Sequence, residues 1–448
     1  MIAKQALVAY WLARDAHGAH RALDLDAASL RARSAARLRA LLVCAERSPF
    51  NAARLREAGL KRPQALRDVE LPLALQSLAP VTKRELREAE SAAVRDGRVS
   101  ASWFSSRSSG SSGEPFRVYY DARAWATLKY LVKMRARRAA GMHMLDRVAI
   151  VDAIEARDEG GAMLERAGRL RRISVFRAPA EIAAMLQRFR PAGIYALPST
   201  LLEVARACDA GAPPVRAARI FTSGELLTGS ARTAITAAFG GELFDIYGTS
   251  ETKEIAWECH AGSRHINSDV VHVEIVDDNG VAVPCGAEGE IVVTLLVNRA
   301  MPLIRYRTGD RGSLLQGGCA CGRQSPLLGV VSGREADVVE LPDGSTISPY
   351  LLTMALEPIR GVAQYQIVQT ERDVLRVRAV AGSDADTGAL DREITTALRR
   401  ELPAGVRIET EIVTRLEHGA RAKVRVVQPL PRSIHAAAAL AAAEASAR

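Results

Sequence analysis

The feature that most constrains the fold is an alternation of short apolar runs with helical stretches between about residues 100 and 330. The apolar runs at 147–154, 192–197 and 218–225 have the length of buried strands. The apolar spacing of 180–189 is typical of a helix that connects two of them. Strands that alternate with helices pair in parallel, because each helix carries the chain back to the same end of the sheet. The sequence therefore predicts an α/β core.

Other segments of the chain have different patterns of apolar residues. Residues 1–100 keep apolar positions at helical spacing, whereas 272–296 has two β-rich arms around an Asn-Gly pair, as in an antiparallel hairpin. The later strand and helix patterns suit a small α+β domain. We therefore predict a large domain over 1–332 with helices around mostly parallel sheets and a small β-rich subdomain, a C-terminal domain over 333–434, and an Ala-rich tail over 435–448.

Charge and composition exclude several classes of protein. Lys plus Arg number 61 and Asp plus Glu 51, a net charge of +10, but the cations are dispersed and aromatic residues make up only 5%. No nucleic-acid-binding motif is present. Because there is neither a long apolar stretch nor a leader pattern, we expect a cytoplasmic protein with no membrane or nucleic-acid partner. Only seven of the cations are lysines, so a lysine in a polar loop stands out.

The Ser- and Gly-rich stretch 105–115 is the strongest local signal for a ligand. Glycines let backbone amides turn toward a phosphate, and serine hydroxyls add further donors. The stretch lies between two expected strands, which favours a functional turn over the flexible linker that composition alone would suggest. The chain has no Gly-Lys pair, so this loop is not a Walker A loop.

Three further motifs are placed where strands are expected to end. Phe221–Glu225 and Asp245–Glu251 each end an apolar run that we expect to be a strand, and open α/β sheets bind ligands at such strand ends. Tyr306–Asp310 places a carboxylate after a Gly turn. Each motif alone is ordinary turn chemistry, and only their combination indicates a function.

The order and spacing of these motifs resemble the adenylate-forming superfamily and, within it, the phenylacetate–CoA ligase family. The segments 48–50, 78–86 and 303–310 also resemble that family, so the resemblance runs nearly end to end. It implies ATP-dependent activation of a carboxylic acid, of the aryl or arylacetic kind, to an acyl-adenylate. Transfer to CoA would then give a thioester, AMP and pyrophosphate, while the C-terminal domain rotates between the two steps.

The resemblance also implies nucleotide-binding roles. The β- and γ-phosphates of ATP would lie in the loop of Ser108, Ser109, Gly110, Ser111, Ser112 and Gly113. The adenine side would be formed by Gly224, Glu225, Asp245, Tyr247 and Gly248. Thr249 would contact the α-phosphate, and Glu251 would hold the Mg²⁺ ion. Asp310 would bind the ribose hydroxyls, helped by Arg334.

Other roles fall on the acyl pocket and the C-terminal domain. Tyr195, Ala196 and Pro198 would lie on the substrate side. Asp337 would be the hinge between the domains. Lys423 would be the catalytic lysine, since an ammonium group can neutralise charge that develops during adenylation. The family's Gly-Lys contact is missing here, so Arg421 is the alternative if the register slips by two residues.

A second group of residues suggests a metal. Cys259, His265, Cys319 and Cys321 would supply three thiolates and one imidazole, which complete a tetrahedral, structural Zn²⁺ site. His260 is the alternative nitrogen ligand, and buried free thiols are the alternative to a metal site. Relatives in the resembled family carry such a site.

Three other functions stay open at this point. The acyl-adenylate could be passed to an amine or another acyl acceptor instead of CoA, or the chain could be a non-catalytic homologue. A basic protein with a zinc knuckle could also bind nucleic acid, although the dispersed charge argues against it. A homodimer is also an open option.

Overall fold

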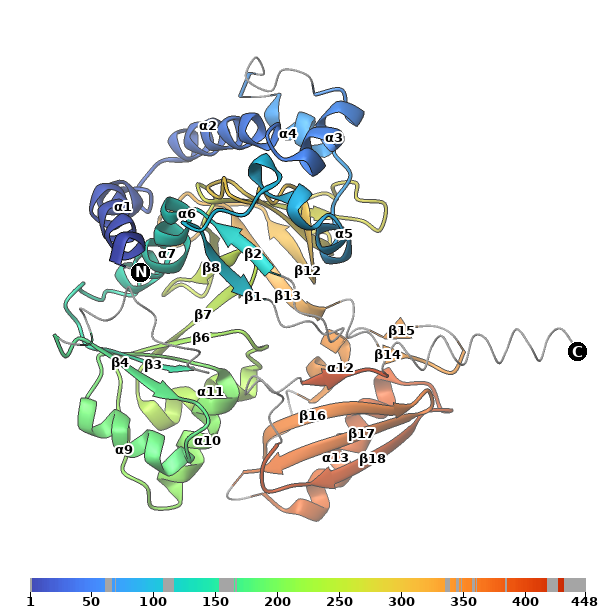
Figure 1. Ribbon diagram of the computed structural model, residues 1–448. Helices are drawn as coiled ribbons and strands as arrows, with labels where there is room; N and C mark the ends of the chain where they lie inside the picture. Colours follow the sequence, from blue (N-terminus) through green and yellow to red (C-terminus); the bar gives the residue numbers. More distant parts are fainter. Residues whose placement is uncertain are drawn as a thin grey trace, which may run out of the picture.

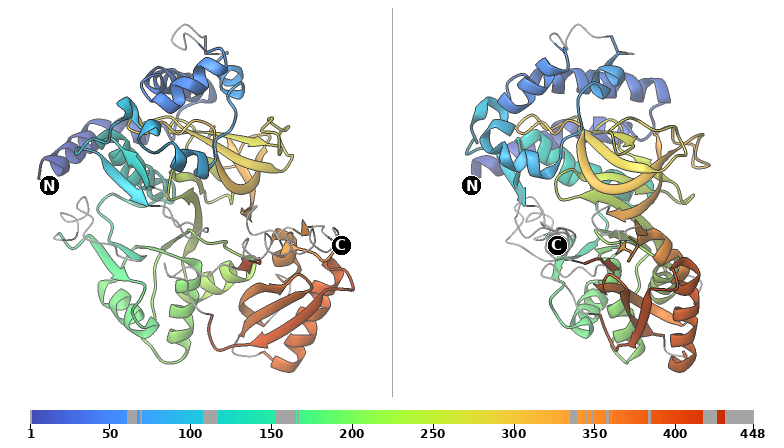
Figure 2. Two further views of the ribbon diagram at one scale, coloured as in Figure 1. Left: turned by 45° about the vertical axis from the view of Figure 1, so that its right-hand side comes forward. Right: turned by 90° about the vertical axis from the view of Figure 1, so that its right-hand side faces the viewer.

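A computed structural model shows three parts, which are a group of N-terminal helices, a main sheet and a C-terminal domain (Figure 1). It describes residues 2–60, 67–68, 70–107, 117–152, 165, 167–334, 339–343, 346–347, 349–356, 359, 361–382, 385–416 and 426–430. N-terminal helices lie at one end, the main sheet lies in the middle, and the C-terminal domain lies beside the parallel half of that sheet (Figures 1 and 2). The expected α/β fold class is confirmed.

The N-terminal helices begin where side-chain caps are present. Asp26 and Ser48 accept hydrogen bonds from the first turns of the second and third helices, and Thr82 forms a capping box with Glu85. The helices are α1 (Ile2–Arg21), α2 (Ala27–Ala45), α3 (Pro49–Glu57), α4 (Leu71–Gln76) and α5 (Lys83–Glu88). Among the described helices, none combines the length and apolar character needed to cross a membrane.

One half of the main sheet is parallel, as the alternating pattern predicts. Its order is β4-β3-β5-β6-β7, and its apolar strands pack against the connecting helices in one buried cluster. The strands are β3 (Val148–Asp152), β4 (Leu170–Ser174), β5 (Gly193–Ala196), β6 (Arg219–Ser223) and β7 (Glu242–Thr249). The connecting helices are α9 (Pro179–Phe189), α10 (Pro198–Asp209) and α11 (Gly229–Phe239).

The other half of the sheet is antiparallel. It continues from β7 through β8 (Lys253–Glu258), β9 (Arg264–Ile266), β13 (Leu327–Arg334), β12 (Tyr306–Leu315), β11 (Gly289–Leu295) and β10 (Val271–Val276). The two arms of the expected hairpin pair as β10 and β11, but twelve residues connect Val276 to Gly289. The Asn-Gly pair makes only a small turn within this connection, because Val276 bridges to Ala282 before the chain reaches β11.

Helices and a small hairpin cover the sheet near its centre. The strands β1 (Phe104–Arg107) and β2 (Arg117–Tyr120) pair antiparallel on either side of the Ser/Gly loop, as expected. The chain then forms α6 (Ala122–Ala126), a π-helical turn (Thr127–Leu131) and α7 (Val132–Ala139). These elements and the antiparallel strands share one large apolar cluster.

The C-terminal domain is a small α+β unit. A four-stranded sheet in the order β18-β17-β16-β19 carries α12 (Pro349–Leu356) and α13 (Thr387–Glu401). Its strands are β16 (Val362–Glu371), β17 (Val374–Ala381), β18 (Arg407–Ile412) and β19 (Val427–Gln428), preceded by the pair β14 (Val339–Glu340) and β15 (Thr346–Ile347). The domain contacts the first where β16 meets α10 and α11, and Gln364 donates a hydrogen bond to the carbonyl of Ser199 at 3.3 Å.

A buried carboxylate connects three parts of the large domain. Asp269, in the segment before β10, accepts two hydrogen bonds from Arg135 of α7, at 2.6 and 2.8 Å. Arg37 and Arg33 of α2 lie 3.1 and 3.3 Å from the same carboxylate. Burial alone would raise the pKa of Asp269, but the three guanidinium groups outweigh it and lower the pKa. The stabilisation is therefore present above the ordinary carboxyl pKa and is lost as the pH falls through the lowered value.

We expect Asp269→Asn to lower the free energy of unfolding by about 3–5 kcal/mol, because it leaves the buried Arg135 without its counter-charge. Urea unfolding at neutral pH measures this change. The matched control is Asp68→Asn, which removes a half-exposed partner of Arg39 and should change the stability by less than about 1 kcal/mol. Equal effects of the two variants would contradict the role given to Asp269.

Candidate active site and metal-ligating cluster

The residues predicted to contact the nucleotide lie near the carboxyl end of β7. Asp245, Tyr247 and Thr249 alternate along this strand and therefore share one of its faces. Glu251 lies two residues after Thr249, the last residue of β7, and its carbonyl accepts a 2.6 Å hydrogen bond from the hydroxyl of Tyr120. The motif thus lies at the end of the strand, as expected.

The predicted adenine and ribose residues lie in contact. The hydroxyl of Tyr247 donates to Oδ2 of Asp310 at 2.8 Å, although 63 residues separate them. Asp310 lies within β12 and not after a turn. Gly309, which takes φ +77°, lies where β12 shifts its register against β11. The backbone of Arg334 pairs with Asp310 across β12 and β13.

Two of the predicted adenine-side carboxylates already have protein partners. Asp245 accepts from the hydroxyl of Thr222 and from Arg264, both at 2.9 Å. Glu225 accepts from the backbone N–H and the hydroxyl of Ser199, at 3.0 and 2.9 Å. Ser199 lies in the first turn of α10, where a negative charge is favourable. These carboxylates therefore hold β6, β7 and α10 in place around the site.

Three lysines that the sequence motifs do not include among the site residues surround this strand end. Lys83 Nζ lies 3.6 Å from Oε1 of Glu251. Lys253 takes φ +63° and donates to the hydroxyl of Ser106 and the carbonyl of Ser250, at 2.7 and 2.8 Å. Lys133 lies 3.8 Å from Glu254. The rarity of lysine in the chain was the sequence signal that could have found them.

Several predicted residues lie outside the described part of the chain. These are the phosphate loop Ser108–Gly113, the hinge residue Asp337, and Lys423 with its alternative Arg421. Tyr195, Ala196 and Pro198 are described and buried at the end of β5 and the start of α10. The Tyr195 ring stacks on Phe221 with a centroid distance of 4.4 Å.

The four predicted metal ligands come together. The ligand atoms of Cys259, His265, Cys319 and Cys321 all lie within 4.8 Å of one another. Cys259 Sγ is 3.5 Å from Cys319 Sγ, and Cys321 Sγ is 3.2 Å from His265 Nε2. Four ligands around tetrahedral zinc would be spaced by about 3.5–3.8 Å, given bonds of about 2.3 Å to sulfur and 2.0 Å to nitrogen. The donor set and its spacing fit zinc.

Protonation states in this cluster also suit a metal. Burial lowers the pKa of His265 to about 4, so its imidazole is neutral and can act as a ligand. Its Nδ1 lies 2.9 Å from the Ser325 hydroxyl, which orients the ring. Burial would raise the pKa of Cys319, but hydrogen bonds with Ser263 and with the other cysteines lower it to about 7. Burial raises the pKa of Cys259 to about 11, a cost that a bound cation would offset.

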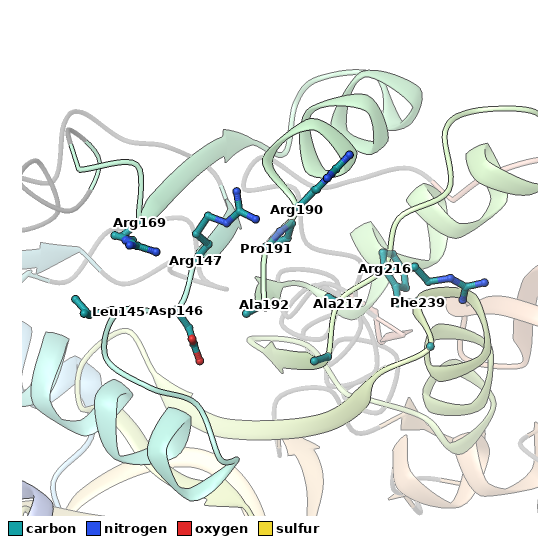
Figure 3. A pocket seen from close by; sticks show the side chains of 12 residues that line it. Leu145, Asp146, Arg147, Arg169, Arg190, Pro191, Ala192, Arg216, Ala217 and Phe239 are labelled. Carbon is teal, nitrogen blue, oxygen red and sulfur yellow. The ribbon is translucent and has the colours of Figure 1, made fainter.

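A hollow of about 420 Å³ lies at the amino ends of the parallel strands (Figure 3). Its rim is formed by the residues that precede β3, β4, β5, β6 and β7, and it includes Arg147, Arg169, Arg190 and Arg216. Among the described residues predicted to bind the nucleotide, Glu225, Tyr247 and Thr249 lie at the carboxyl ends of β6 and β7. The hollow is therefore separate from the candidate active site.

Sequence comparisons support the predicted resemblance. A family model of the CapK C-terminal domain matches residues 339–429. The phenylacetate-coenzyme A ligase of Thermus thermophilus is 28% identical over 242 residues, 52% of each chain, so the match spans about half of that relative. The phenylacetate-coenzyme A ligase of Aromatoleum evansii is 29% identical over 341 residues, 72% of this chain and 73% of the relative.

The fold is also found among solved structures. A 2-hydroxyisobutyryl-CoA ligase, in the postadenylation state and in complex with 2-HIB-AMP, superposes with a TM-score of 0.74. The superposition covers 94% of both chains at 21% sequence identity. The expected resemblance to phenylacetate–CoA ligases and the expected adenylate-forming fold are both confirmed.

Proposed function

From its sequence relationship to phenylacetate–CoA ligases and its adenylate-forming fold, we propose that this chain activates a carboxylic acid with ATP and transfers the acyl group to CoA. The acid would be aryl or arylacetic, as the names of the sequence relatives suggest. The carboxylate would attack the α-phosphorus, pyrophosphate would leave, and the thiol of CoA would then displace AMP from the acyl-adenylate.

The observation that carries the proposal is the contact between Tyr247 and Asp310. It joins the end of β7 to β12, so an aromatic face for adenine and a carboxylate for the ribose hydroxyls lie at one place. Thr249 shares the face of β7 with Tyr247 and would contact the α-phosphate. This is the carboxyl edge of the parallel strands, where open α/β sheets bind nucleotides.

Glu251 fits the role of a magnesium ligand. Glu251 is 7% exposed, and Lys83 Nζ lies 3.6 Å from its Oε1. This ion pair involves one carboxylate oxygen, so Oε2 could bind a hard cation. The remaining ligands would be phosphate oxygens and water. The ion would neutralise charge on the phosphates, while Lys83 would help to hold the Glu251 carboxylate in place.

The C-terminal domain would serve both half-reactions. We propose that it brings Lys423 to the carboxylate during adenylation and then rotates about Asp337 to admit CoA. The contact between Gln364 and Ser199, which lies next to the predicted acyl loop, supports this role of the domain. Rotation of a small domain is a common way to use one site for two successive steps.

We propose that Cys259, His265, Cys319 and Cys321 hold a structural zinc ion. Four protein ligands leave no open position on the metal for a substrate. The ion would join the Cys259 turn after β8 to the knuckle between β12 and β13. Its contribution would be to the stability of the antiparallel half of the sheet rather than to the reaction.

The first test is ATP–pyrophosphate exchange with a panel of aryl and arylacetic acids. We expect at least one acid to stimulate exchange, and we expect Lys423→Ala to lower the rate by about a hundredfold or more, because a charge-stabilising donor is lost. Arg421→Ala is the matched control and should stay close to the parent. If no acid stimulates exchange, the proposed activity is wrong. If only Arg421→Ala loses activity, Arg421 has the role given to Lys423.

The second test identifies the acceptor. With ATP and an active acid, we expect pyrophosphate release at steady state to require CoA, because the thiol removes the bound acyl-adenylate. An acyl-CoA product detected by mass spectrometry would support this acceptor. Release that depends on an added amine, with an amide as product, would instead assign an amide-forming ligase.

The third test concerns the metal. Protein purified without chelators should contain about one equivalent of zinc, since structural sites of four Cys and His ligands bind it tightly. Cys319→Ser should lower the zinc content and the melting temperature together. Cys285→Ser, which alters an exposed thiol outside the cluster, should change neither. Less than about half an equivalent of zinc in the parent protein would count against the site.

A further inference from the structure

A group of charged side chains connects the Tyr195 loop to the strand beside the Tyr-Gly-Thr segment. Lys133 and Arg137 come from one face of α7, and Glu254 comes from β8. Lys133 Nζ lies 3.8 Å from Oε1 of Glu254, and Arg137 Nε donates to the Tyr195 hydroxyl at 3.3 Å. Both cations also lie over the Tyr195 ring, at 5.9 and 5.0 Å from its centre. Four polar groups therefore meet on the predicted substrate side.

The backbone fixes the position of Glu254 next to the nucleotide motif. In the pairing of β7 with β8, Glu254 lies opposite Gly248, the residue between Tyr247 and Thr249. A Cβ atom at position 248 would come within 3.0 Å of the Glu254 Cα and within 2.3 Å of the Lys253 carbonyl oxygen. Only glycine permits this approach. Glu254 is therefore held against the part of β7 that would contact the α-phosphate.

One oxygen of this carboxylate has no partner. Glu254 is 9% exposed, and its Oε2 is fully buried without a hydrogen bond among the residues that the structure describes. Burial raises the pKa of Glu254, while Lys133 and Arg137 act in the opposite direction. A buried acceptor without a donor is costly and is rare in folded proteins. A ligand that supplies a donor would remove this cost.

We infer that the acid activated by this chain carries a hydroxyl or amino group that donates a hydrogen bond to Oε2 of Glu254. This inference rests on the proposed adenylation activity and makes its substrate class narrower. A purely apolar aryl acid would leave the buried carboxylate oxygen without a donor. A site built around a polar partner discriminates strongly against an analogue that lacks it.

The experiment compares matched acids in ATP–pyrophosphate exchange. Phenylacetate and benzoate are each measured beside their ring-hydroxylated and ring-aminated derivatives, with every ring position represented. We expect the best substituted acid to exceed its parent acid by about a hundredfold or more in kcat/KM. Comparing the hydroxylated with the aminated series shows which of the two donors the site takes.

The Glu254→Leu variant separates substrate selection from folding. Lys133, the ion-pair partner of Glu254, is 37% exposed and can turn to solvent, so replacing the carboxylate with an apolar side chain of similar size is expected to change the melting temperature little. The same change should reduce the preference for the substituted acid at least tenfold. Glu258→Gln is the matched control, because Glu258 is equally buried on β8 but is bonded to Arg232 and to the Asp245 N–H. It should leave the ratio between the two acids unchanged.

The outcomes separate this inference from the proposed function. Exchange with substituted and parent acids at similar rates, or an unchanged ratio in Glu254→Leu, would overturn the role of Glu254 while leaving the adenylation activity in place. The absence of exchange with every acid would overturn both. A large preference that Glu254→Leu removes and Glu258→Gln keeps would establish the inference.

Discussion

The carboxylate of Asp269 is the interaction on which the arrangement of the large domain depends. It joins α2, α7 and the segment before β10 through three arginines. Because Arg135 is held on one side of α7, Lys133 and Arg137, which are four residues apart, are turned together to the other side. The same buried ion group that fastens the N-terminal helices to the sheet therefore sets the direction of the two cations over the Tyr195 ring, on the predicted substrate side.

The chemistry of the candidate site is distributed between two kinds of carboxylate. Asp245 and Glu225 have their oxygens bonded to the protein and position β6, β7 and α10. Glu251 and Glu254 are buried nearby, each with a lysine at 3.6–3.8 Å. The first pair holds β6, β7 and α10 around the candidate site, and the second pair would serve the proposed metal and the proposed substrate. Three of the chain's few lysines are placed around this one strand end.

Much of the fold and part of the site could be predicted from the sequence, and the remainder depends on tertiary packing. Strand and helix periodicity is local, so the α/β core followed from it. The cysteine and histidine ligands were recognisable because few residue types bind zinc, but their approach depends on the pairing of β9 with β13, which no local pattern encodes. The Asn-Gly pair was misleading, since a small turn can lie inside a longer connection. Glu254 was missed because a single acid in a strand gives no signal until α7 covers it.

Ser199 is held from two directions. Glu225 of the large domain binds its N–H and hydroxyl, and Gln364 of the C-terminal domain binds its carbonyl. Breaking the contact between the domains therefore removes a bond one residue from Pro198, at the wall of the predicted acyl pocket. By thermodynamic reciprocity, an acid that tightens this wall must also favour the domain arrangement in which the bond exists. With the acyl pocket placed here, as proposed, the first turn of α10 would let occupancy of the pocket and the position of the small domain influence one another.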